Sequence, residues 1–144
     1  MRHVLTFLTA LLLLLGASAT QAIAQSAADT NATLDDLFGD HAPYQAFFEK
    51  LKTAVAADDK ETVAAMVDYP FQARIDDRAI KIKDRKHFVS DYETVITPEV
   101  KQAVAQQTYG TLFANWQGVM IGDGEIWFSG IGDDNKIKII AIND

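Results

Sequence analysis

Short apolar segments separated by turn signals constrain the fold of this chain more than any other feature. Residues 108–143 are rich in aromatic and β-branched residues, which favour strands. Turn signals interrupt this region at Gln117-Gly118, at Asp123-Gly124 and over residues 132–135. Because tight turns join antiparallel neighbours, the pattern predicts an antiparallel meander. Its strands are expected at residues 108–116, 119–121, 125–131 and 136–143.

The stretch VMIGDGEIWF, residues 119–128, also predicts a strand register. A two-residue turn at Asp123-Gly124 pairs residue 119 with 128 and residue 121 with 126. One face then carries Val119, Ile121, Ile126 and Phe128, and we expect it to be core. The other face carries Met120, Gly122, Glu125 and Trp127. That second face is expected either to line a ligand cavity or to form an outer or dimer surface.

Helical patterns precede the meander, and each begins at a recognisable start signal. Pro43 suits a first helical turn, and Asp59, Asp84 and Thr97 suit N-caps. Apolar residues then recur at helical spacing. Helices are expected at residues 43–57, 60–68, 85–96 and, after the restart at Thr97, up to about residue 106.

Between the second and third of these helices, the sequence FQARIDDRAIKI predicts a β-hairpin. A two-residue turn at Asp76-Asp77 pairs Phe71 with Ile82 and Ala73 with Ile80. The apolar residues then share one face.

The order of elements predicts an α+β fold, with two or three N-terminal helices packed on a curved, mixed or antiparallel sheet. With YPF (69–71) before the hairpin and LFANWQGVMIGDGEIWFSG (112–130) in the tail, the chain resembles the nuclear transport factor 2-like superfamily, in particular its small exported members. The resemblance covers residues 43–143. It implies a cystatin-like cone, a bent sheet wrapped over helices. The superfamily includes isomerases, dehydratases and non-enzymatic binding modules, so the fold does not choose a function.

The N-terminus is typical of a secretory signal peptide, with a basic start, an apolar run to Leu15 and a small-residue ending at Ala22-Ile23-Ala24. We expect cleavage after Ala24 and export to a bacterial periplasm or the outside of the cell. An uncleaved anchor is the rival interpretation, but the apolar run is shorter than the roughly 20 residues of a spanning helix. Residues 25–42 are expected to form a flexible lead-in, followed by one domain over residues 43–144.

Composition excludes several classes of function. The chain has no Cys, which excludes disulfides, thiol catalysis and thiolate metal sites. Its 20 Asp and Glu outnumber its 13 Lys and Arg, which argues against a nucleic-acid partner. His41 and His87 lack the spacing of metal ligands, so neither a metal nor a cofactor is expected. After signal cleavage no membrane association is expected.

Two acids are candidates for catalysis. Glu125 is the only acid within the late strands, and Asp68 stands just before the hairpin. In enzymes resembling ketosteroid isomerase, a carboxylate inside the cone acts as general base. The hairpin of this chain offers no acid at residues 71–75, which departs from that pattern.

Five residues are candidates for ligand binding because each has a large apolar side chain, which in four of them also carries a polar tip. They are Tyr92, Tyr109, Trp116, Met120 and Trp127. The leading hypothesis is an exported, non-enzymatic module that binds a small apolar ligand or a protein partner, with a homodimer through the sheet implied by the resemblance. The alternative is a cofactor-independent isomerase or lyase that uses Glu125 or Asp68 with a tyrosine. The basic cluster Lys81, Lys83, Arg85 and Lys86 is expected to be a solvated face rather than an anion site.

Overall fold

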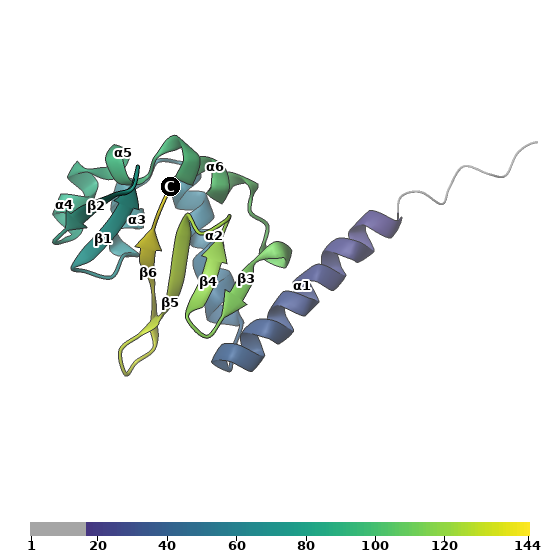
Figure 1. Ribbon diagram of the computed structural model, residues 1–144. Coiled ribbons are helices and arrows are strands. Elements are labelled where there is room, and N and C mark those ends of the chain that lie inside the picture. The colour runs from purple at the N-terminus through teal and green to yellow at the C-terminus, as the bar shows by residue number, and fades with distance from the viewer. Residues whose placement is uncertain (1–16) are drawn as a thin grey trace, which may run out of the picture.

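The computed structural model describes residues 17–144, and within them the chain has an α+β architecture (Figure 1). The helices are α1 (Ala17–Phe38), α2 (Ala42–Ala56), α3 (Lys60–Ala65), α4 (Arg85–Ser90), α5 (Tyr92–Val95), α6 (Pro98–Gln106) and the 3-10 helix η1 (Tyr109–Thr111). The strands are β1 (Phe71–Ile75), β2 (Arg78–Ile82), β3 (Phe113–Asn115), β4 (Gly118–Ile121), β5 (Ile126–Ile131) and β6 (Lys136–Ile142). The predicted fold class is confirmed.

Two antiparallel sheets meet along β6. One is the β1–β2 hairpin, and the other has the strand order β3-β4-β5-β6 of a meander. The outer edge of β6 contacts the chain around the hairpin, because Asp68 N–H donates to the Ile139 carbonyl at 3.0 Å and Asp144 N–H donates to the Arg74 carbonyl at 3.1 Å. The hairpin therefore continues the sheet beyond β6 and bends it (Figure 1).

The hairpin has the predicted register. Phe71 pairs with Ile82 and Ala73 with Ile80. Asp76 and Asp77 both have positive φ, 49° and 58°, which is the backbone conformation of a type I′ turn. This turn matches the twist of the flanking strands and so holds the apolar side of the hairpin toward the core.

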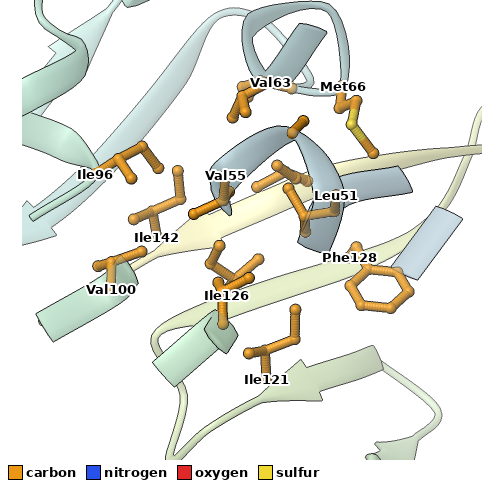
Figure 2. Packing of buried hydrophobic residues seen from close by; sticks show 14 of the residues in the cluster. Leu51, Val55, Val63, Met66, Ile96, Val100, Ile121, Ile126, Phe128 and Ile142 are labelled. Atoms are coloured by element: carbon orange, nitrogen blue, oxygen red, sulfur yellow. The ribbon is translucent and has the colours of Figure 1, made fainter. Parts of the chain in front are cut away.

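The core lies between α2 and the inner face of the four-stranded sheet. Val119 pairs with Phe128 and Ile121 with Ile126, as predicted, and all four side chains are buried. The loop between them has four residues, 122–125, since the ladder ends at the Ile121–Ile126 pair. Figure 2 shows Leu51 and Val55 of α2 over strand residues such as Ile126. The apolar stripe of α2 and the apolar residues on the inner face of the sheet are therefore buried against each other.

Three predicted N-caps are confirmed. The side chains of Asp59, Asp84 and Thr97 accept hydrogen bonds from the backbone N–H three residues later, at 3.1, 2.8 and 3.4 Å. Other boundaries were predicted wrongly. The second helix ends at Ala65, the third breaks at Asp91 into α4 and α5, and residues 109–111 form η1 instead of strand.

The flexible lead-in predicted for residues 25–42 is corrected by the structure, which has α1 over most of it. Leu34 is fully buried, the Tyr109 hydroxyl donates to Asn31 Oδ1 at 2.6 Å, and Phe38 stacks on Tyr44 with ring centroids 4.5 Å apart. Ser26 Oγ donates to the Gly110 carbonyl. The second half of α1 is therefore part of the folded domain. Residues 1–16 of the predicted signal peptide lie outside the described residues, so its cleavage stays a prediction.

No helix within residues 17–144 is both long enough and apolar enough to span a bilayer.

Docking of α1 can be tested with two leucines of the same helix. Leu34→Ala removes a fully buried side chain, and we expect a loss of about 2–5 kcal/mol in the free energy of unfolding. Leu37→Ala is the matched control, because Leu37 is 39% exposed, and its effect should stay within about 0.5 kcal/mol. Urea unfolding of the two variants measures both values. Equal effects would contradict a docked α1.

Candidate functional site

A row of apolar side chains crosses the outer face of the four-stranded sheet. The strand register aligns Phe113 of β3, Met120 of β4, Trp127 of β5 and Ala141 of β6 as successive cross-strand neighbours. Phe113 is 50% exposed, and Met120 and Trp127 are half-buried. In Figure 1, α2 lies behind the sheet and no described helix lies in front of it. We call these four residues the outer row.

Two contacts shape the outer row and its surroundings. The rings of Phe113 and Trp127 meet edge to face, with centroids 6.4 Å apart and an interplanar angle of 83°. Trp116, in the turn from β3 to β4, is 81% exposed. Asn115 Oδ1 accepts the Gln117 N–H at 2.8 Å and supports that turn. Trp116 therefore adds exposed apolar surface at the β3–β4 turn, near the outer row.

The structure does not bring the two candidate tyrosines to this face. Tyr92 is fully buried and Tyr109 is 8% exposed, so both belong to the core rather than to the mouth of a cone. Of the five residues predicted to bind a ligand, Trp116, Met120 and Trp127 lie on or beside the outer sheet face. Phe113 was missed by the sequence analysis. The turn predicted at Gln117-Gly118 is wrong, because Gly118 belongs to β4 and pairs with Asn115. A turn at residues 116–117 would have placed Phe113 opposite Met120 and so identified it.

Tyr92 lies beneath a network of charged side chains. Lys60 Nζ and Lys101 Nζ lie 5.3 and 5.7 Å from the centroid of its ring. Lys101 Nζ also contacts Asp58 Oδ1 at 2.8 Å, and both lysines contact the Glu93 carboxylate. Burial, and then the negative charge of Asp58, raise the pKa of Tyr92 to about 12. The Tyr92 hydroxyl has no hydrogen-bond partner among the described residues, which costs stability.

Glu125 lies at an open groove of about 400 Å³ between α6 and the loop 122–125. Its Oε2 accepts the Asp123 N–H at 2.6 Å and so holds the loop. Gly122, at φ 64°, leaves room for this carboxylate, because a Cβ there would lie 2.1 Å from Glu125 Oε2. The groove is also lined by amide side chains such as Gln102 and Gln106. Glu125 therefore has a structural role in a polar, water-facing setting.

Asp68, the other candidate acid, is half-buried beside β6, where its backbone N–H donates to the Ile139 carbonyl. Neither Asp68 nor Glu125 forms a hydrogen bond with a tyrosine hydroxyl in the part of the chain that the structure describes. The two acids also lie on different elements, Asp68 beside Ile139 of β6 and Glu125 in the loop that joins β4 to β5. The structure thus does not assemble them into one constellation.

One cluster of potential metal ligands escaped the sequence analysis. Ligand atoms of Asp35, Asp40 and His41 lie within 4.8 Å of one another at the junction of α1 and α2. Asp35 Oδ1 accepts a hydrogen bond from the backbone N–H of His41 at 2.7 Å, and it lies 2.8 Å from Nδ1 of the His41 ring. The hydrogen bonds from His41 lower the pKa of Asp35. Asp40 Oδ1 accepts the Ala42 N–H at 2.9 Å. These bonds satisfy two backbone N–H groups at the start of α2, which accounts for the cluster. His87 Nε2, the other histidine considered, lies 3.2 Å from Asp91 Oδ2.

The two buried tyrosines give a paired prediction. Tyr92→Phe removes an unpaired buried hydroxyl, so we expect the free energy of unfolding to rise by about 1 kcal/mol. Tyr109→Phe removes the bond to Asn31, and we expect it to fall by about 1 kcal/mol. Denaturant unfolding at constant pH measures both. A loss of stability in Tyr92→Phe would show that its hydroxyl has a partner.

Comparison with known proteins adds no further assignment, because no family model, no curated protein and no solved structure matches the chain.

Proposed function

We propose that the protein is an exported, non-enzymatic interaction module, and that a second copy of the chain binds to its outer row. The observation that carries this proposal is the uncovered apolar row Phe113, Met120, Trp127 and Ala141 across all four strands. An exposed apolar face of a sheet that carries aromatic residues is favourable to bury against another protein. The predicted signal peptide and the resemblance to the nuclear transport factor 2-like superfamily support export and pairing through the sheet.

The order of residues in the outer row suits pairing with itself. A two-fold axis between β4 and β5 would place Phe113 opposite the partner's Ala141, and Met120 opposite the partner's Trp127. Large side chains would then meet smaller ones, which favours close packing. Such an isologous contact closes after two copies and exposes no further row.

The isomerase or lyase alternative has less support in the geometry. It needs an acid in an apolar pocket beside a tyrosine hydroxyl. Glu125 instead holds a loop at a polar groove, and the Tyr109 hydroxyl donates to Asn31. The small-ligand version of the binding hypothesis would need a pocket at Trp127, whereas the grooves at Glu125 and at Pro70 are lined by other residues.

Sedimentation equilibrium of the mature chain tests the self-association. We expect a monomer–dimer equilibrium that Met120→Lys, which puts a charge at the centre of the row, weakens by at least about tenfold. Leu37→Lys is the matched control, since Leu37 is another partly exposed apolar residue but lies on α1. This variant should leave the monomer–dimer equilibrium unchanged. A wild-type chain that stays monomeric at all accessible concentrations, or a Met120→Lys chain that dimerises normally, would refute the proposal.

A further inference from the structure

The outer edge of β2 has no strand beside it in residues 17–144, where β1 is its only partner. The two-residue turn makes Ile75–Arg78 the pair that closes the hairpin. Hydrogen-bonded and non-hydrogen-bonded pairs alternate from there, so residues 78, 80 and 82 bond to β1. The backbone N–H and C=O groups of Ala79 and Lys81 then point away from the hairpin. Both residues are exposed, so this edge can accept another strand.

Four cations without ion-pair partners flank this edge. Arg78, Lys81, Lys83 and Lys86 are all exposed, and none forms a salt bridge within the described chain. The other two basic residues nearby are already paired, Arg74 with Asp77 at 3.4 Å and Arg85 with Glu61 at 3.0 Å. The acids nearest this edge in sequence are Asp76 and Asp77 in the turn and Asp84, which follows Lys83 and accepts the His87 N–H. The six basic residues outnumber these three. A local positive surface therefore persists on a chain whose net charge is −7.

A groove of about 410 Å³ opens at one end of the same edge. It is lined by Pro70, Phe71, Gln72, Lys81, Ile82 and Lys83. Ring and aliphatic carbons of Pro70, Phe71 and the lysine stems make part of this lining apolar. A side chain from an added strand could occupy the groove, which is how strand addition gains specificity.

We propose that the outer edge of β2 binds an acidic, extended peptide segment of a partner protein by β-strand addition. The segment would bond to the backbone of Ala79 and Lys81, place its carboxylates beside Lys81 and Lys83, and seat one apolar side chain in the groove. A second copy of this edge is a poor occupant, because its own cations would repel these. The proposal does not depend on the proposed dimer, since β2 lies beyond β1, outside the four strands that carry the outer row (Figure 1).

The experiment uses a synthetic hexapeptide that alternates Glu and Val, with a Lys-Val hexapeptide as the probe of opposite charge. We expect the acidic peptide to bind the mature chain, more weakly as salt is raised, and the basic peptide not to bind. Bound peptide should slow hydrogen exchange at the amides of Ala79 and Lys81. Isothermal titration and amide exchange by NMR provide the two readouts.

Two variant pairs separate strand addition from a charge effect. Ala79→Pro removes an outward N–H at an edge position that tolerates proline, and binding should fall at least about tenfold, while Ala79→Val keeps the N–H and should still bind. Lys81→Glu should abolish peptide binding. Lys136→Glu makes the same charge change at an exposed lysine of β6 and should leave peptide binding unchanged.

Three results would overturn the proposal: no binding of the acidic peptide, equal binding of the basic peptide, or normal binding to Ala79→Pro. If Ala79→Pro does not fold, unprotected amides at Ala79 and Lys81 in the saturated wild-type complex would overturn it equally. Met120→Lys should bind the acidic peptide normally, so failure of the dimer and failure of the peptide site can be told apart.

Discussion

Burial of the inner sheet face beneath α2 is the interaction on which the rest of the structure depends. Phe128 of β5 lies against Phe47 and Tyr44 of α2, with ring centroids 4.9 and 6.4 Å apart. Leu51 and Val55 continue this contact along the helix (Figure 2). Because successive strand residues point to opposite faces, the burial of Phe128 commits Trp127 to the outside. The core and the outer row are thus two consequences of one register.

The same packing explains where exposed functional surface remains. The helices of the described chain cover one face of the meander and leave the other uncovered, while the hairpin extends the sheet past β6 and leaves β2 as its last strand. The two edges of the sheet differ in their surroundings. At β3, α1 lies alongside and contributes Leu34 to the core. At β2, exposed lysines and an arginine stand beside free backbone groups. The molecule therefore has an apolar surface across the outer face of the meander and a basic edge at β2.

Local chemistry made much of this fold predictable. The caps at Asp59, Asp84 and Thr97 involve a side chain and an N–H three residues away, so the residues that decide them are adjacent in sequence. The hairpin register follows from Asp76-Asp77, whose short polar side chains tolerate positive φ. The buried set Val119, Ile121, Ile126 and Phe128 follows from alternation alone. Helix α1 was not predictable in this way. Its apolar stripe is short, and the residues it contacts, Tyr109 and Gly110, are far away in the sequence.

By itself, the sequence determined the α+β class, the order of the main helices and strands after α1, the registers of β1–β2 and β4–β5, and the placement of Phe128 and Trp127 on opposite faces. Each of these rests on alternation or on turn and cap chemistry within a few residues. Only the tertiary structure decided which aromatic residues are exposed. Tyr92 and Tyr109 have the same amphipathic character as Trp127, yet they are buried under α6 and α1, and Glu125 became a loop support instead of a free acid. Solvent exposure depends on what packs above a side chain, and that is set by contacts between segments far apart in the chain.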